Sequence, residues 1–280
     1  MENVIHALTL TLLAGSATGL GGAMILFLKR LSSNFLAAAL GLSAGVMIFI
    51  SLAELYPEAQ SAAGSAGLDN ARVWVLLAFF GGMGLITLID FLVPEYENPH
   101  EATGLTLNAR TAATEMIHDS EQSGNAAALK KLGVMSALAI AIHNFPEGMA
   151  TFIGALNDSG TGTGITFAIA LHNIPEGIAV AIPIYYATRS KAKALIYATL
   201  SGLTEPLGAA ICYGVTALSG IRISDGGLAF PLILAAVAGI MIYISLDELL
   251  PTAEKYGKHH VAIAGVVGGM AIMGVSLLVL

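Results

Sequence analysis

Long apolar stretches alternate with short polar connections along nearly the whole chain. A helix needs about 20 predominantly apolar residues to cross a bilayer, and eight stretches of that length follow one another here. The pattern therefore predicts an all-α membrane protein that forms one domain over residues 1–280. The expected helices are Val4–Leu28, Asn34–Glu58, Arg72–Val93, Lys131–Leu156, Gly162–Ala187, Lys193–Leu218, Leu228–Ala253 and Val261–Leu280.

The composition supports a membrane location and excludes most other classes of protein. Hydrophobic residues make up 56% of the 280 residues and charged residues only 11%, whereas soluble domains carry about 25% charged residues. Polar surface is too scarce for a soluble, disordered or nucleic-acid-binding protein. Cys212 is the single cysteine, which excludes an internal disulfide framework. We expect the lipid bilayer as the surroundings and no nucleic acid as a partner.

The basic residues fall almost entirely on one side of the predicted membrane. Ten of the twelve Lys and Arg residues lie in the first, third, fifth and seventh connections. Basic residues accumulate in cytoplasmic loops, so these connections should be cytoplasmic and both termini should lie outside the cytoplasm. The one long connection, residues 94–129, is then a cytoplasmic loop between helices three and four. Its His100 and His118 leave a metal-sensing role open beside that of an ordinary solvated loop.

Two sequence repeats indicate an inverted internal symmetry. The motif HNFPEG at His143–Gly148 recurs as HNIPEG at His172–Gly177, in two helices that run in opposite directions. The segment Gly45–Ala59 matches Gly239–Ala253 at ten of fifteen positions, again in helices of opposite direction. Three helices, a central antiparallel pair and three inverted helices (3+2+3) satisfy both repeats. A site at the interface of inverted repeats is typical of transporters.

The repeated motif places metal-binding side chains on one face of each central helix. At 100° per residue, Glu147 lies between His143 and Asn144 on the helix surface. The second motif repeats this geometry with His172, Asn173 and Glu176. If the two faces meet, they form a cluster with a histidine side and an asparagine side, and each glutamate can bridge two cations. Imidazole with carboxylate suits Zn²⁺ and similar ions, and amide oxygen with carboxylate suits harder ions.

Prolines and one further glutamate strengthen the hypothesis of a polar pathway. Pro146 and Pro175 cannot donate to the carbonyl groups four residues earlier, and freed backbone groups at membrane depth are tolerated where they line a cavity. Glu205, near the middle of the sixth helix, adds a third carboxylate on the asparagine side. Each ionisable group costs about 2.5–3.5 kcal/mol even on a mild membrane scale. We therefore favour metal binding over a purely structural role.

Four other carboxylates are candidates for the two ends of a pathway. Glu54 and Glu58 lie toward the outer end of the second helix, and Asp247 and Glu248 lie toward the inner end of the seventh. Capping at the membrane interface is the alternative, because ionisable residues near the end of a span reach the headgroups at low cost.

Glycine spacing bears on helix packing. GxxxG occurs at Gly15–Gly19, Gly41–Gly45 and Gly265–Gly269. In a chain with 32 glycines, this spacing favours close packing within the chain over dimer formation. A homodimer is left open as a partner.

The segments HNFPEGMATF and HNIPEGIAVAIPIYYATRSK resemble the ZIP family of divalent metal transporters, and within it the bacterial ZupT-type subgroup. The resemblance extends over nearly the whole chain and includes SLAELYP, SLDELLP and SGLTEPLGA. It implies uptake of Zn²⁺, with relaxed selectivity toward Fe²⁺, Mn²⁺, Co²⁺ and Cd²⁺, across the inner membrane into the cytoplasm. These ions are transported ligands, and no prosthetic group is implied.

The same resemblance implies which residues bind metal. One site would consist of His143, Glu147, His172 and Glu176. The other would consist of Asn144, Glu147, Asn173, Glu176 and Glu205. The exit route of the family would fall on Asp247 and Glu248.

An intramembrane metallohydrolase is the principal alternative, because it also needs histidine and acidic ligands. Such an enzyme requires an open coordination position and a general base. The sequence has no HExxH motif, and the candidate ligands are symmetric across an inverted repeat. We therefore predict a transporter and not an enzyme. A metal-gated sensor is also disfavoured, because the sequence has no sizeable soluble output domain.

Overall fold

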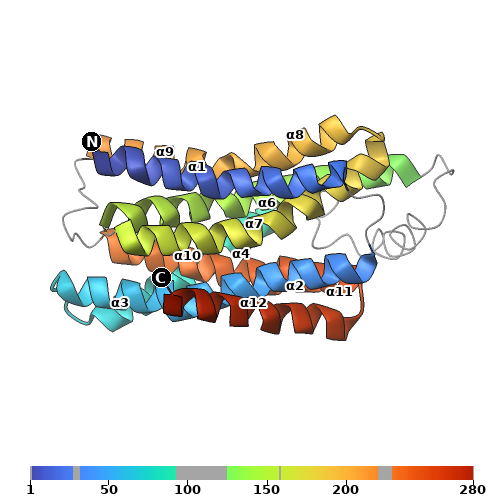
Figure 1. Ribbon diagram of the computed structural model, residues 1–280. Helices are drawn as coiled ribbons and strands as arrows, with labels where there is room; N and C mark the ends of the chain where they lie inside the picture. Colours follow the sequence, from blue (N-terminus) through green and yellow to red (C-terminus); the bar gives the residue numbers. More distant parts are fainter. Residues whose placement is uncertain (1, 28–31, 93–124, 158, 220–228, 280) are drawn as a thin grey trace.

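The computed structural model describes residues 2–27, 32–92, 125–157, 159–219 and 229–279, and every regular element in these ranges is helical (Figure 1). Seven helices are long and apolar enough to cross a membrane. They are Asn3–Leu26, Asn34–Ser65, Ala71–Ile89, Gly162–Ile182, Lys191–Val215, Phe230–Lys255 and His259–Leu278. At this level the predicted all-α membrane fold is confirmed.

The individual elements follow the chain in this order. The first half contains α1 (Glu2–Ala23) with the 3₁₀ turn Met24–Leu26, α2 (Ser33–Ile50), the π-helical turn Ser51–Leu55, α3 (Tyr56–Ser65), α4 (Ala71–Leu92) and α6 (Asn125–Asn157). The second half contains α7 (Ser159–Thr188), α8 (Lys191–Gly202), α9 (Thr204–Ser219), α10 (Ala229–Ile244), the π-helical turn Ser245–Leu249, α11 (Leu250–Tyr256) and α12 (His259–Val279).

The helices form three layers, with α6 and α7 side by side in the middle (Figure 1). Helices α1, α8 and α9 cover one side of this central pair, and α2 and α10 cover the other. Helices α4 and α12 lie outermost, where α4 packs on α10 and α12 packs on α2. Both motif-bearing helices are therefore enclosed by protein, which is where polar side chains in a membrane protein are tolerated.

The observed helix boundaries differ from the expected ones by a few residues at most helix ends and more substantially in three places. The second helical unit continues to Ser65 instead of ending at Glu58. The sixth unit is not one helix, since α8 ends at Gly202 and α9 begins at Thr204. Pro206 explains this break, because it cannot donate to the carbonyl of Gly202. Helix α6 begins at Asn125, so the last residues of the expected 94–129 loop are helical, and residues 94–124 lie outside the described residues.

Two π-helical turns interrupt α2–α3 and α10–α11 at equivalent places in the long sequence repeat. The Tyr56 N–H donates to the Ser51 carbonyl, and the Leu250 N–H donates to the Ser245 carbonyl, five residues back in each case. A proline follows each turn, at Pro57 and Pro251. Proline lacks an N–H, and its ring clashes with the carbonyl four residues earlier. Widening the turn by one residue relieves that clash, and π turns of this kind often mark functional sites.

Glycines allow the layers to approach to backbone contact. A Cβ atom at Gly15 of α1 would overlap the Gly202 carbonyl oxygen of α8, and a Cβ atom at Gly21 would overlap the Ile174 carbonyl oxygen of α7. The other GxxxG glycines face helices of the same chain as well, such as Gly45 against Val266 of α12. The preference for packing within the chain is thus confirmed at these positions.

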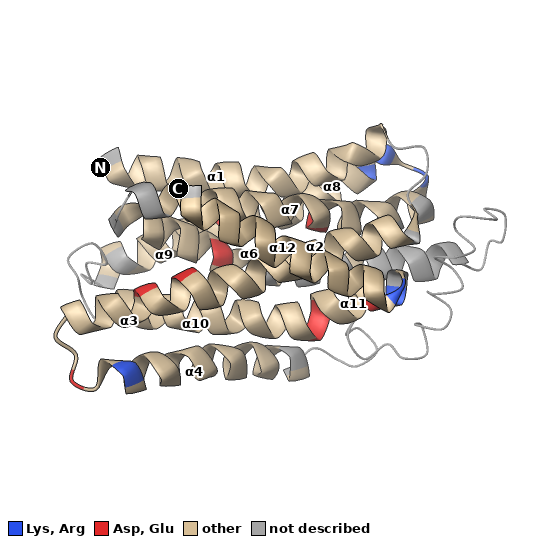
Figure 2. Cartoon of the chain, turned by 60° about the horizontal axis from the view of Figure 1, so that its bottom comes forward, with Lys and Arg blue, Asp and Glu red and all other residues tan. Residues whose placement is uncertain are grey.

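Most described basic residues lie at one end of the bundle, and both chain termini lie toward the other (Figures 1 and 2). Arg189, Lys191 and Lys193 flank the α7–α8 junction, and Lys255 and Lys258 lie at the α11–α12 junction. The Lys191 ammonium donates to the Leu26 carbonyl at 2.9 Å, which ties the end of the first helical unit to this same end. Arg72 is the second residue of α4, and the first turn of α4 lies at the opposite end (Figure 2).

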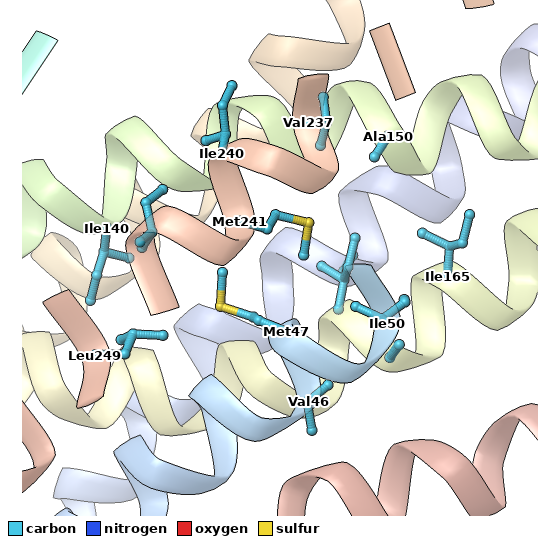
Figure 3. Packing of buried hydrophobic residues seen from close by; sticks show 14 of the residues in the cluster. Val46, Met47, Ile50, Ile140, Ala150, Ile165, Val237, Ile240, Met241 and Leu249 are labelled. Carbon is cyan, nitrogen blue, oxygen red and sulfur yellow. The ribbon is translucent and has the colours of Figure 1, made fainter. Parts of the chain in front are cut away.

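A buried apolar cluster joins α2 and α10 to the central pair. Figure 3 shows Met47 of α2 and Met241 of α10 pointing toward each other between the helices. Both methionines are fully or almost fully buried. Val237 of α10 and Ala150 of α6 belong to the same buried cluster (Figure 3). This cluster separates the polar centre from the outer helices α4 and α12.

We predict that Gly21→Ala destabilises the bundle, because the added methyl group meets the Ile174 backbone, which cannot move independently of α7. Overpacking of this kind costs about 1–3 kcal/mol in the free energy of unfolding. Gly81→Ala in α4 is the matched control, since no heavy atom lies within 4 Å of its added Cβ and replacing a helical glycine gains about 0.5–1 kcal/mol. Thermal unfolding in detergent measures both. A Gly21→Ala midpoint at or above that of Gly81→Ala would contradict the close packing.

Candidate metal centre

The two HNxPEG motifs bury their described polar side chains inside the helical bundle, where His172 of one motif faces Glu147 of the other. Asn144 and Glu147 of α6 and His172, Asn173 and Glu176 of α7 are all fully buried, as is Glu205 in the first turn of α9. Both motif helices continue through their prolines, since α6 runs past Pro146 and α7 past Pro175. His143 lies in α6, but its side chain is outside the described residues.

Each motif ends in a glycine that fixes how closely its helix meets the neighbouring layer. A Cβ atom at Gly148 would overlap the Glu205 carbonyl oxygen, and a Cβ atom at Gly177 would overlap the Thr18 carbonyl oxygen. The motif glycines therefore set α6 against α9 and α7 against α1. This contact carries Glu205 into the same cluster as Asn173.

On the histidine side, His172 faces a carboxylate of the other central helix. Its Nε2 lies 3.3 Å from Glu147 Oε1, and its Nδ1 lies 3.1 Å from the Ala168 carbonyl oxygen. A carbonyl can only accept a hydrogen bond, so Nδ1 carries the proton and the Nε2 of a neutral ring has a lone pair. That lone pair then faces a carboxylate oxygen. A cation between Nε2 and Glu147 would turn this unfavourable pair of acceptors into a pair of ligands.

On the asparagine side, both amide groups donate to the layer formed by α1 and α8. Asn144 Nδ2 donates to the Ser201 carbonyl at 3.2 Å, and Asn173 Nδ2 donates to the Ala14 carbonyl at 3.0 Å. Asn173 Nδ2 also donates to Glu205 Oε1. These bonds hold the amide planes in place and leave the Oδ1 atoms available as acceptors.

Several buried oxygens of this cluster have no hydrogen-bond donor among the described residues. They are Asn144 Oδ1, Asn173 Oδ1 and both carboxylate oxygens of Glu147. Leaving a buried acceptor unsatisfied costs about 1–3 kcal/mol, and more for a charged group. Amide and carboxylate oxygens are ligands for divalent cations. The donor set therefore fits an ion that would satisfy several of these oxygens at once.

Glu176 has a protein donor that sequence reasoning missed. Ser43 Oγ of α2 donates to Glu176 Oε1 at 3.0 Å and lies 3.4 Å from the His172 carbonyl oxygen. Ser43 is fully buried. In the sequence it is one small residue within an apolar stretch, so only the packing of α2 on α7 reveals its role. The backbone acceptors of Ala14 and Ser201 carry no sequence signal either.

The four candidate pathway carboxylates lie in or directly after the two π-helical turns. Glu54 lies in the π turn Ser51–Leu55 and is partly buried, as is Glu58 in α3. Glu54 is eleven residues beyond Ser43, a separation of about 16 Å at the helical rise. Asp247 and Glu248 lie in the second π turn, where Asp247 is exposed and Glu248 partly buried.

Within the side chains that the structure describes, no three His, Cys, Asp or Glu residues lie close enough together to hold a metal ion. The expected ligand His143 is not among those side chains. The described contacts instead pair His172 with Glu147, Asn173 with Glu205 and Ser43 with Glu176.

Comparison with known proteins finds one family and many close relatives. The family model described as ZIP Zinc transporter matches residues 2–277. The chain is 50% identical to zinc transporter ZupT of Chlorobium phaeovibrioides, over 100% of both chains. It is 48% identical to zinc transporter ZupT of Clostridium perfringens, over 99% of this chain and 97% of the relative. It is 49% identical to zinc transporter ZupT of Streptococcus mutans, over 99% of this chain and 98% of the relative.

We predict that Asn173→Asp makes stability depend on metal. The change replaces the amide that donates to Glu205 with a second carboxylate in a fully buried place. An uncompensated buried charge costs about 3 kcal/mol, so the thermal midpoint should fall in the presence of a chelator. Added Zn²⁺ or Mn²⁺ should restore it, because two adjacent carboxylates bind a divalent cation.

The control is Asn173→Leu, which removes the same hydrogen bonds without adding charge. Its midpoint should fall as well but should not respond to metal. Equal midpoints for Asn173→Asp with and without metal would contradict the proximity of this position to a cation site.

Proposed function

The chain belongs to the ZIP zinc transporter family, and from that premise we propose that it imports divalent transition-metal ions into the cytoplasm through the cluster between α6 and α7. The family consists of transporters and not of enzymes, and the chain is a multi-pass membrane protein with divalent metal ions as its substrates. The alternative of an intramembrane metallohydrolase has no support from these relatives. We propose that the protein transports Zn²⁺ in preference to other ions and also transports Fe²⁺, Mn²⁺, Co²⁺ and Cd²⁺. The membrane that it spans is, in this proposal, the inner membrane.

The proposed centre binds two ions, with Glu147 and Glu176 between them. His143 and His172 complete the first position. Asn144, Asn173 and Glu205 complete the second. The buried acceptors Glu147 Oε1 and Oε2, Asn144 Oδ1 and Asn173 Oδ1 support this assignment, because they point to more than one place where an ion would be stabilised. Imidazole and carboxylate on one side and oxygen ligands on the other also explain a broad choice of metals.

We propose eight transmembrane helices in a 3+2+3 arrangement, with α6 as the span beyond the seven described above. Helix α6 has 33 residues, which is long enough to cross a bilayer. His143, Asn144 and Glu147 interrupt its apolar stretch. Polar residues in such a helix are compatible with a span that is covered by protein on both sides, as α6 is by α9 and α10.

Repeated backbone contacts support an inverted two-fold relation between the first and last three helical units. Equivalent residues of the first and sixth helical units are 187 positions apart in the sequence. Gly15 is thus equivalent to Gly202, and each of these glycines packs on the carbonyl of the other. The same shift converts Gly21 into Gly208. Gly21 packs on the Ile174 carbonyl, and Gly208 packs on the Phe145 carbonyl, its counterpart in the other motif.

The outer helices obey the same relation. Gly45 of α2 packs on the Val266 carbonyl of α12. Its counterpart in the long repeat, Gly239 of α10, packs on the Phe79 carbonyl of α4. The central amides do so as well, since Asn173 donates to Ala14 and Asn144 donates to Ser201, again 187 positions apart. Transporters with inverted repeats place their substrate site at the interface of the repeats, and this supports the proposal that the buried polar residues of α6 and α7 bind the transported ion.

We propose that both termini lie outside the cytoplasm. The support is the concentration of described basic residues at the end of the bundle away from the termini (Figure 2), because basic residues favour the cytoplasmic side. Glu54 and Glu58 would then serve the outer end of the pathway, and Asp247 and Glu248 the inner end. Glu54 and Glu248 are equivalent positions of the long repeat, which is consistent with matching roles at opposite ends.

We predict that Glu147→Ala and Glu176→Ala each nearly abolish Zn²⁺ uptake, because each carboxylate would contact both ions. Full-length protein in liposomes loaded with a zinc-sensitive dye measures the initial rate. Glu254→Ala is the control, since this exposed carboxylate pairs with His259 at 2.7 Å and lies outside the centre. Uptake at the wild-type rate by both buried-site variants would contradict transport through the central cluster. If the wild-type protein showed no zinc uptake, the proposed function itself would be refuted.

A further inference from the structure

The two-fold relation is broken beside the asparagine pair. The shift of 187 positions that relates α1 to α8 and α9 converts Thr18 into Glu205. Glu205 accepts a hydrogen bond from Asn173 in the cluster. The structure therefore places a hydroxyl in α1 where α9 has a carboxylate, and Thr18 is as fully buried as Glu205.

The Thr18 hydroxyl lacks the partner that its neighbours in α1 have. Thr9, Thr11 and Ser16 donate to the carbonyls four residues earlier, at 2.8, 2.9 and 2.6 Å. The corresponding carbonyl for Thr18 is that of Ala14, which accepts from Asn173 at 3.0 Å instead. Thr18 Oγ1 has no hydrogen-bond partner among the described residues. A buried hydroxyl without a hydrogen-bond partner lowers the stability of the fold by about 1–3 kcal/mol. A bound ligand that contacts the hydroxyl would offset this loss.

Packing places this hydroxyl against α8, next to the residue whose carbonyl binds Asn144. Thr18 Oγ1 lies 3.0 Å from the position of a Cβ atom at Gly202 of α8. Gly202 directly follows Ser201, whose carbonyl accepts from Asn144. The Thr18 backbone carbonyl meets Gly177, which directly follows Glu176. Thr18 thus lies where α1, α7 and α8 meet, next to the segments that hold both proposed asparagine ligands.

We propose that the Thr18 hydroxyl is a further oxygen ligand of the divalent ion on the asparagine side, as the counterpart of Glu205 in α1. This inference rests on the proposed function and adds to it a residue that sets metal preference. Threonine and serine hydroxyls bind Mg²⁺ in nucleotide-binding loops, and oxygen ligands suit Mn²⁺ better than they suit softer ions. A hydroxyl in place of a second carboxylate also removes one negative charge from the site, which weakens binding enough for the ion to leave.

The test compares three single variants of the full chain in detergent. Thr18→Val keeps the shape of the side chain and removes the oxygen, whereas Thr18→Ser keeps the oxygen. Thr11→Val is the matched control, because Thr11 is a fully buried threonine of the same helix whose hydroxyl is bonded to Ala7. Isothermal titration with Mn²⁺ and with Zn²⁺ gives the affinity of each protein for each ion.

We expect Thr18→Val to weaken Mn²⁺ binding about tenfold, within the range measured when groups around metal sites are removed. Zn²⁺ binding should change less, because the histidine side is intact. Thr18→Ser and Thr11→Val should bind both ions as the wild type does. A Thr18→Val protein with the Mn²⁺ and Zn²⁺ affinities of Thr11→Val would overturn the proposal.

If Thr18→Val does not fold, Thr18→Ala removes the same oxygen with a smaller side chain and is judged by the same titrations. The liposome assay on wild-type protein separates this inference from the proposed function. Zinc flux in the wild type together with unchanged Mn²⁺ affinity in Thr18→Ala would refute the role of Thr18 alone. Wild-type protein that binds neither ion would refute both.

Discussion

The free-energy cost of holding carboxylates away from water governs this structure. Glu147, Glu176 and Glu205 are fully buried in the middle of a helical bundle. Two of them have identified donors, since Ser43 donates to Glu176 and Asn173 donates to Glu205. Among the described side chains, Glu147 faces the ring of His172, which opposes its charge only when protonated. We propose that a bound cation supplies the missing charge, so the burial of these carboxylates is the feature from which we infer a metal site.

The small residues of the motifs make this arrangement possible. Gly148 and Gly177 allow α6 and α7 to touch the backbone of α9 and α1. These contacts bring the amides of Asn144 and Asn173 within hydrogen-bond distance of main-chain carbonyls in the adjacent layer. In a membrane, close packing and hydrogen bonds between helices replace the hydrophobic effect as the source of helix association. One motif therefore supplies the proposed ligands, the hydrogen bonds that orient two of them and the close packing of the helices that carry them.

Much of this architecture follows from the sequence because its repeats are so similar. The doubled HNxPEG motif predicts that Glu147 and Glu176 belong to one metal cluster, and this stays a prediction. Glu205 was expected on the asparagine side, and it accepts a hydrogen bond from Asn173. Ser43 and Thr18 were not predicted, since a single hydroxyl in an apolar helix usually bonds to its own backbone. The π turns were also missed, because hydrophobic periodicity does not distinguish a widened turn from a regular one. The Ser65 end of the second unit was missed for a related reason, since its polar last turns resemble a loop in sequence.

Anomalous diffraction from crystals soaked in Cd²⁺ tests the central claim most directly. The account predicts two peaks between α6 and α7, about 3.5–4 Å apart, as is typical of bridged ion pairs. One peak should lie beside His172 and Glu147, and the other beside Asn144, Asn173 and Glu205. A single peak within the cluster would refute the binding of a second ion but would still be consistent with a metal pathway through the cluster. Peaks confined to Glu54, Asp247 or other carboxylates at the ends of the bundle would contradict the claim that the buried centre binds the metal.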